Sequence, residues 1–286
     1  MSRYIILAES GGDVPADLAS RYGIYIIPMH VNFDTETKDD GFFPVEELFD
    51  FYKRTHHLPK TAACNIYDYN KIFDRIHAEH PEAHIIYLAY SAVTTSSYAS
   101  GLLAMEGRDY ITAFDTKHVS AGQCFVVTMV ARYIEANPDT TVEDIIAYAT
   151  KISSSTRMGF FPGDLDYLRA GGRVSNAAYL GAKILSLTPL IEIQNGYLVA
   201  TSKYRGKMDR IAPKMLKDFS ESQRLSSEML YLIFSAGLPE SLKAELTSQA
   251  RDMGYKEVRW IQTGSVVSTH SGPAAFGIVG MTEDER

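Results

Sequence analysis

The sequence predicts an α/β protein made of two lobes. In the first half of the chain, short apolar runs alternate with segments of helical spacing, as expected for strands joined by helical crossovers in a parallel sheet. In the second half, Asn195-Gly196 joins two strand-like runs, which is a strong signal for an antiparallel hairpin. A chain of 286 residues is long enough for two moderate domains. We therefore expect an N-terminal parallel-sheet α/β domain over residues 1–156 and a C-terminal α+β domain with a mixed sheet over residues 157–286.

The elements of the first domain follow from its apolar runs and turn residues. Pro15 suits the first position of a helix, and Thr141 with Asp144 suits a helix N-terminus. The predicted strands are residues 4–8, 24–29, 85–89 and 110–114, and the predicted helices are residues 16–22, 45–54, 67–79, 98–106, 123–135 and 141–152. In such a sheet, ligands bind in the loops that follow the carboxyl ends of the strands.

The second domain mixes strands and helices without a regular alternation. The predicted strands are residues 157–161, 190–194, 197–203, 229–235 and 258–262, and the predicted helices are residues 165–169, 177–187, 206–221 and 238–253. Residues 269–273 are bounded by glycine and proline, so they are expected to form a turn that carries His270.

Composition and charge exclude several classes of protein. The formal net charge is -7 and there is no run of basic residues, which argues against a nucleic-acid-binding protein. Cys64 and Cys124 do not form a disulfide framework and are expected to be packing residues. The apolar stretch near the N-terminus is too short for a signal peptide, and no run is long enough to span a membrane. We expect a cytoplasmic protein.

Hydroxyl side chains are concentrated directly after the predicted strand 85–89, in the segment AYSAVTTSSYAS of residues 89–100. A strand-to-helix loop exposes backbone N–H groups at the helix N-terminus, where an anion binds favourably. Ser91, Thr95 and Ser96 would add hydroxyl donors. Helix capping alone explains one or two such residues but not so many. The segment therefore favours an anion site, although it has no glycine before residue 101 and is not a P-loop.

Three other residues stand out, each with a structural alternative. Thr61 lies between two helical segments and would either donate to a ligand or cap the next helix. Arg173 follows Gly171-Gly172 and would either bind an anion or a partner, or simply lie on the surface. His270 would be a hydrogen-bond donor, a general base or a turn residue. No G-x-S-x-G elbow supports a serine hydrolase, and no Cys/His motif supports a metal site.

Taken in order along the chain, these segments resemble the DegV family of bacterial fatty-acid-binding proteins. The similarity covers six motifs, and Glu9 stands where the family has Asp, while Ser96 stands where it has Gly. The six matching segments are residues 8–15, 60–64, 91–100, 115–122, 165–174 and 270–274.

The resemblance implies a two-lobed protein that buries one long-chain fatty acid, of the palmitate, stearate or oleate type, between its lobes. It implies that the carboxylate is held by Thr61, Ser91, Thr95, Ser96 and His270. Several family members are the carrier subunit of a fatty-acid kinase, and the kinase, not the carrier, catalyses acyl-phosphate formation. Arg173 would then face the kinase. No cofactor other than the bound fatty acid is implied, and transient contact with a membrane surface is compatible with this role.

Two alternatives remain open from the residues themselves. The first is an acyl hydrolase or transferase that uses a serine of the 91–97 cluster together with His270. The second is a lipid-responsive regulatory protein that has no kinase partner.

Overall fold

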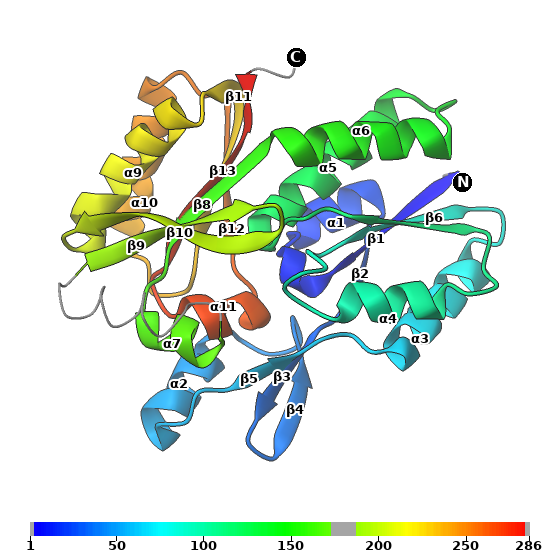
Figure 1. The fold of residues 1–286 in the computed structure, drawn as a ribbon, viewed down its shortest axis with the longest axis horizontal. Helices are drawn as coiled ribbons and strands as arrows, with labels where there is room; N and C mark the ends of the chain where they lie inside the picture. Colours follow the sequence, from blue (N-terminus) through cyan, green and yellow to red (C-terminus); the bar gives the residue numbers. More distant parts are fainter. Residues whose placement is uncertain (1–2, 173–186, 284–286) are drawn as a thin grey trace.

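The computed structural model describes residues 3–172 and 187–283, and these residues form three β-sheets with helices around them (Figure 1). The expected α/β fold is confirmed, with a parallel sheet in the N-terminal part and a mixed sheet in the C-terminal part. The predicted helix 177–187 falls almost entirely on residues 173–186, which lie outside the described residues.

The parallel sheet has the strand order β2-β1-β6-β7, and every neighbouring pair is parallel. Its strands are β1 (Tyr4–Glu9), β2 (Tyr25–Ile27), β6 (His84–Ala89) and β7 (Ile111–Asp115). The helices that pack around it are α1 (Ala16–Tyr22), α3 (Ile66–Glu79), α4 (Ser97–Ala104), α5 (Ser120–Ala136) and α6 (Val142–Ser155).

Strand β1 is apolar throughout because both faces of the sheet are covered. Tyr4, Ile6 and Ala8 belong to the hydrophobic cluster that includes α5 and α6. Ile5 and Leu7 point to the opposite face and belong to the cluster that includes α3. Alternating side chains of one strand thus fill two separate cores, as expected for a parallel sheet between helical layers.

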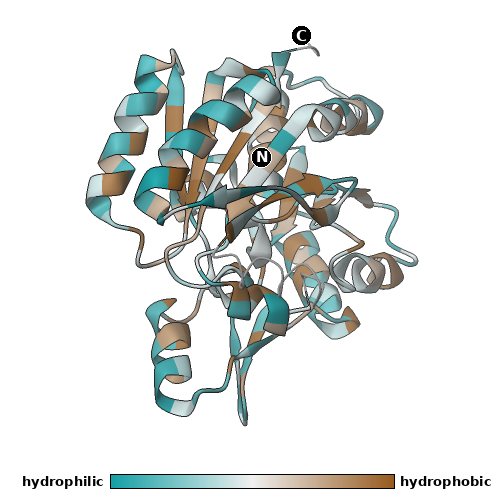
Figure 2. Cartoon of the chain, turned by 60° about the vertical axis from the view of Figure 1, so that its left-hand side comes forward, coloured by the Kyte–Doolittle hydropathy of each residue, from teal (hydrophilic) through white to brown (hydrophobic). Residues whose placement is uncertain are grey.

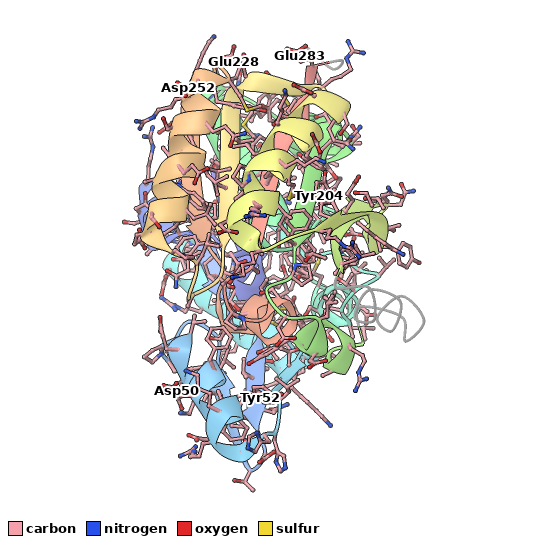
Figure 3. All side chains as sticks on the ribbon, turned by 90° about the vertical axis from the view of Figure 1, so that its left-hand side faces the viewer. Asp50, Tyr52, Tyr204, Glu228, Asp252 and Glu283 are labelled. Carbon is pink, nitrogen blue, oxygen red and sulfur yellow. The ribbon has the colours of Figure 1, made fainter. Side chains whose placement is uncertain are left out.

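A small antiparallel sheet was missed by the sequence prediction. It has the order β4-β3-β5, and the helix α2 lies between β4 and β5 along the chain. The elements are β3 (His30–Phe33), β4 (Glu36–Asp39), β5 (Lys60–Ala62) and α2 (Glu46–Thr55). The strands are three or four residues long and carry many polar side chains, so no apolar run reveals them. In Figure 3, Asp50 and Tyr52 of α2 lie at one end of the molecule, opposite Glu228, Asp252 and Glu283.

The mixed sheet has the order β10-β9-β8-β13-β11-β12, in which only β11 and β12 are parallel. The predicted hairpin at Asn195-Gly196 is confirmed as the connection between β9 and β10. The strands are β8 (Thr156–Phe161), β9 (Leu187–Gln194), β10 (Tyr197–Arg205), β11 (Leu225–Phe234), β12 (Glu257–Gln262) and β13 (Phe276–Thr282), and the helices α9 (Met208–Ser222) and α10 (Glu240–Asp252) cover one face.

The prediction of a turn at residues 269–273 is wrong for most of the segment. His270 lies in the last turn of a helix, α11 (Ser265–Ser271), and the chain then enters β13 in the interior of the mixed sheet. The sequence of α11 is rich in Ser, Thr and Val, which have low helix propensity. The helix therefore depends on its surroundings, which are described below.

Helix α5 lies between the two large sheets and joins their cores (Figure 1). Phe125 of α5 packs edge-to-face on Tyr231 of β11, with ring centroids 5.2 Å apart. Both large sheets show strongly apolar strands in Figure 2, whereas the surface helices are banded with polar residues. None of the helices in the described part of the chain combines the length and apolar character needed to cross a membrane.

Candidate functional site

A cavity of about 310 Å³ lies between the loops of the parallel sheet and the mixed sheet. This volume is at the lower end of the range typical of small-molecule sites. Its lining is mostly apolar and includes one group of hydroxyl and imidazole side chains. The apolar lining includes Met29, Val119, Met158, Phe160, Leu168, Leu198, Ile233, Val266 and Phe276, and the polar lining includes Thr61, Thr94, Thr95, Ser96, Ser120, Thr263, His270 and Ser271.

The segment between β6 and α4 contributes three consecutive lining residues, Thr94, Thr95 and Ser96. Ser96 is the N-cap residue of α4, but its side chain makes no capping hydrogen bond. The first turn of a helix also leaves backbone N–H groups without partners inside the helix. The cavity wall therefore presents hydroxyl groups of the Ser/Thr segment together with the N-terminus of α4.

Ser91 lies in the same segment but does not line the cavity. Its side chain is fully buried, and its hydroxyl donates to the carbonyl oxygen of Gly196 at a distance of 2.9 Å. The expectation that Ser91 contacts a ligand therefore does not agree with the structure. Ser91 instead attaches the loop to the turn of the β9–β10 hairpin, a contact that requires the tertiary fold.

Thr61 and His270 meet across the cavity although they are 209 residues apart in the chain. The hydroxyl oxygen of Thr61, on β5, lies 2.9 Å from Nε2 of His270. On the other side of the imidazole, the backbone of Gly171 approaches closely: a Cβ added there would lie 2.0 Å from Nδ1 of His270. Gly171 thus leaves the space that the imidazole of His270 occupies. Arg173 itself lies outside the described residues.

Two buried carboxyl groups, those of Asp13 and Asp40, hold the N-terminus of α11. Asp13 Oδ1 accepts from the backbone N–H of Gly264 at 2.7 Å, and Asp40 Oδ1 accepts from that of Ser265 at 2.7 Å. Asp13 also accepts from the hydroxyl of Ser120, at the start of α5. Acceptors at a helix N-terminus pair the N–H groups that have no partner inside the helix, so these acids offset the low helix propensity of α11 and place His270 at the cavity.

The buried environment raises the pKa of both acids. Burial raises the pKa of Asp13 well above its usual range, while the hydrogen bonds from Ser120 and Gly264 oppose the shift and the nearby Asp40 carboxyl adds to it. Burial likewise raises the pKa of Asp40. Gly264 lies close to both acids. A Cβ at this position would be 3.1 Å from Asp40 Oδ1 and 3.2 Å from Asp13 Oδ1. Sequence reasoning did not single out this pair, although Asp13 stands within the first matching motif.

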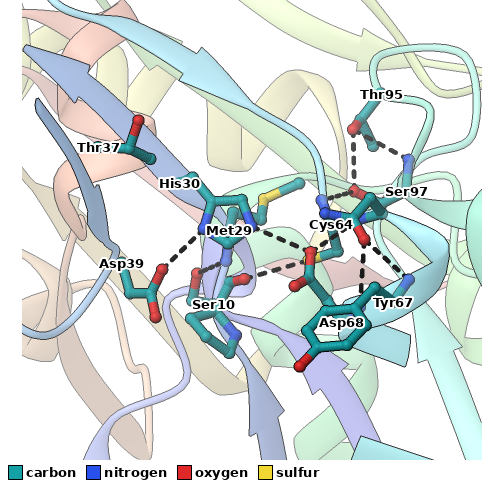
Figure 4. A network of polar contacts seen from close by, with 12 residues as sticks. Ser10, Met29, His30, Thr37, Asp39, Cys64, Tyr67, Asp68, Thr95 and Ser97 are labelled. Atoms are coloured by element: carbon teal, nitrogen blue, oxygen red, sulfur yellow. Dashed lines mark hydrogen bonds and ion pairs between the residues drawn. The ribbon is translucent and has the colours of Figure 1, made fainter. Parts of the chain in front are cut away.

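A series of polar contacts connects the small sheet to the cavity wall (Figure 4). His30 Nε2 lies 3.1 Å from Asp68 Oδ2. Asp68 in turn accepts from the backbone N–H of Asn65. The backbone N–H of Cys64 donates to Ser97 Oγ at 3.2 Å. Ser97 Oγ lies 3.1 Å from the hydroxyl oxygen of Thr95. The 60–64 segment and the Ser/Thr segment are therefore held side by side.

This arrangement combines an apolar wall with one uncharged polar group, as would suit an amphipathic anion. Among the described lining residues there is no Lys or Arg, so the polar group offers uncharged donors and one imidazole. The hydroxyl facing Nε2 of His270 belongs to Thr61, not to a serine of the 91–97 cluster. Within residues 3–172 and 187–283, no three His, Cys, Asp or Glu side chains are grouped so as to hold a metal ion.

Fold and cavity together define a two-lobed α/β protein with a mostly apolar cavity between its large sheets. The model of the DegV family, described as an uncharacterised protein family, matches residues 3–283. The chain therefore belongs to the DegV family, as its motifs indicated.

Relatives and solved structures support this assignment over nearly the full length. A fatty acid-binding protein of Thermotoga maritima is 26% identical over 282 residues, covering 95% of each chain. The structure of a DegV family protein from Thermus thermophilus, described as fatty acid binding, is similar with a TM-score of 0.86 and 22% identity over 98% of this chain and 99% of that one. A stearic acid-binding protein from Eubacterium ventriosum has a TM-score of 0.79 at 20% identity, with 99% of each chain covered. The two structural similarities show the shared fold.

Proposed function

We propose that this protein binds one long-chain fatty acid in the cavity and does not itself catalyse a reaction. The acyl chain lies against the apolar wall, which includes Val119, Met158 and Ile233. The carboxylate lies at the group formed by Thr61, Thr95, Ser96 and His270. Family membership and the ligands of the relatives named above support the ligand class.

The observation that carries the proposal is the composition of the cavity wall. A mostly apolar wall with one group of hydroxyls, a helix N-terminus and an imidazole matches a molecule that has a long apolar body and one anionic end. Each buried methylene contributes about 0.8 kcal/mol, so a chain of about 15 methylenes contributes about 12 kcal/mol before the costs of association. Association costs about 4 kcal/mol or more of this, so the affinity depends on how well the head group is paired.

The head group decides whether the complex forms, because an unpaired carboxylate in a dry site costs several kcal/mol. Hydrogen bonds from Thr61, Thr95 and Ser96, from the first turn of α4 and from His270 would offset this cost. Uncharged donors hold the carboxylate less strongly than an Arg or Lys would. Such a site can release or present the carboxylate to another protein.

We further propose that the partner is the catalytic subunit of a fatty-acid kinase, which phosphorylates the bound carboxylate. The resemblance of residues 165–174 to the family's Gly-Gly-Arg motif supports this role, with Arg173 at the partner surface. A pull-down with the cognate kinase tests it: binding that is lost in Arg173→Ala supports the carrier role, and no binding by the wild type supports a lipid-responsive regulator.

Native mass spectrometry of the purified protein, followed by organic extraction, tests the ligand. We expect one added mass per chain that extracts as a fatty acid, and no hydrolysis of acyl esters by the protein alone. The triple substitution Thr61→Ala, Thr95→Ala and His270→Ala should reduce oleate retention. Ser100→Ala is a matched control, since this hydroxyl lies on α4 outside the cavity wall. An apo protein that takes up neither oleate nor palmitate contradicts the proposal.

A further inference from the structure

Glu9 is a fully buried carboxyl group at the end of β1 that the proposed binding site does not use directly. Its two oxygens have separate sets of donors. Oε1 accepts from the hydroxyls of Tyr69, at 3.1 Å, and of Tyr87. Oε2 accepts from the backbone N–H of Tyr90 and from Nε2 of Gln123, both at 2.9 Å. Burial raises the pKa of Glu9, and its hydrogen bonds oppose the shift.

The bond to Tyr90 connects Glu9 to the cavity. Tyr90 lines the cavity and is the first residue after β6, in the segment that continues to residues 94–96. A second carboxylate acts nearby, because Asp115 accepts from the backbone N–H of Ala92 at 3.2 Å. Two acids thus hold the backbone at the start of this segment. Thr95 and Ser96 follow in the same segment and line the cavity beside the N-terminus of α4.

The turn that follows Glu9, at residues Ser10–Gly12, is packed against the same groups. A Cβ at Gly11 would lie 3.2 Å from the ring of Tyr90. A Cβ at Gly12 would lie 2.6 Å from Oε1 of Gln123. Both glycines therefore allow the end of β1 to reach the residues that Glu9 binds, which explains the sequence Glu-Ser-Gly-Gly at this point.

We propose that Glu9 is a positioning residue of the carboxylate site: by binding the backbone of Tyr90 it fixes the β6–α4 segment so that Thr95, Ser96 and the N-terminus of α4 meet the ligand's carboxylate. The inference rests on the proposed function. It does not require Glu9 to touch the ligand. Its effect is transmitted through the backbone, so it should act on the head group and not on the acyl chain.

The test compares an anionic ligand with a neutral one in Glu9→Leu. Leucine has a similar size but no acceptor oxygen, so the backbone N–H of Tyr90 loses its partner. We expect the affinity for oleate to fall about tenfold or more, equivalent to about 1.4 kcal/mol per tenfold. The affinity for oleyl alcohol, which needs mainly the apolar wall, should change less than about twofold. Tyr69→Phe is the control, because it removes one donor to Oε1 and leaves the bond to Tyr90 in place.

Three results would overturn the inference. An equal loss of oleate and oleyl alcohol would show a general structural role, and unchanged binding of both would show that Glu9 positions nothing. If the wild type binds oleyl alcohol but not oleate, the proposed function itself fails, which is distinct from failure of the variant. Should Glu9→Leu not fold, Glu9→Gln leaves one oxygen for the four donors around this side chain, and the same comparison of ligands applies.

Discussion

The contact between Gly171 and His270 offers the sharpest perturbation of the site. Gly171 ends α7 (Leu165–Ala170) with φ -73 and ψ -6, a helical conformation that alanine adopts without strain. A Cβ at this position would nevertheless lie 2.0 Å from Nδ1 and 2.8 Å from Cε1 of His270. The substitution Gly171→Ala must therefore displace the imidazole, because the added methyl group would overlap it. The backbone conformation at residue 171 suits alanine, so no backbone strain adds to this effect.

The expected magnitude follows from the bonds that the imidazole makes. Displacement breaks the 2.9 Å contact between His270 Nε2 and the Thr61 hydroxyl and removes the imidazole from the proposed carboxylate position. A hydrogen bond to a charged group contributes about 1.5–3 kcal/mol. The dissociation constant for oleate should therefore rise about tenfold to a hundredfold.

Calorimetric titration with oleate measures this change, and thermal unfolding measures stability in parallel. Gly172→Ala is a matched control at the neighbouring position. Gly172 has φ +70, so alanine there is strained by about 1–2 kcal/mol, but its Cβ meets no atom of the described residues within 4 Å. The reasoning is refuted if Gly171→Ala binds oleate as tightly as the wild type, or if both variants lose the same affinity.

Three further predictions concern stability. Burial lowers the pKa of His30, but its bonds to Asp68 and Asp39 outweigh burial, so the pKa is raised overall. The contribution of His30 to the free energy of unfolding is therefore fully present below about pH 6.5 and is lost as the pH rises through the pKa of the folded state. The difference in unfolding free energy between wild type and His30→Gln should thus be larger near pH 6 than near pH 9, and a difference independent of pH would contradict this. Phe125→Ala should cost about 3–5 kcal/mol in urea unfolding, because it leaves a cavity between the two large sheets; a loss below about 1 kcal/mol would be inconsistent with that packing. Thr141→Ala should cost about 1 kcal/mol through loss of the capping box of α6, and no loss would show that the cap is dispensable.

The sequence predicted the elements that have strong local signals. The continuous apolar runs of β1 and β6 identified strands buried on both faces, and Asn195-Gly196 located the β9–β10 hairpin. The capping residues Thr141 and Asp144 were also recognised correctly. Each of these signals depends on a few neighbouring residues, so it can be recognised without knowing the rest of the fold.

The small sheet and α11 could not be predicted in the same way. The strands β3, β4 and β5 are short and largely polar, and they are stabilised by pairing across residues 30–62. Helix α11 consists of poor helix formers, and Asp13 and Asp40 stabilise its N-terminus from distant parts of the chain. Local propensity is overridden in both places by contacts that exist only after folding.

The sequence by itself determined the fold class and the family, and it singled out four of the polar residues that line the cavity, because motifs and apolar periodicity are local properties of the chain. Only the tertiary structure decided which hydroxyls face the cavity. It turned Ser91 toward Gly196 and left Thr95 and Ser96 on the cavity wall, although all three belong to one segment. The direction of each side chain depends on backbone contacts made by residues far away in sequence, so neighbouring hydroxyls with the same chemistry acquire different roles.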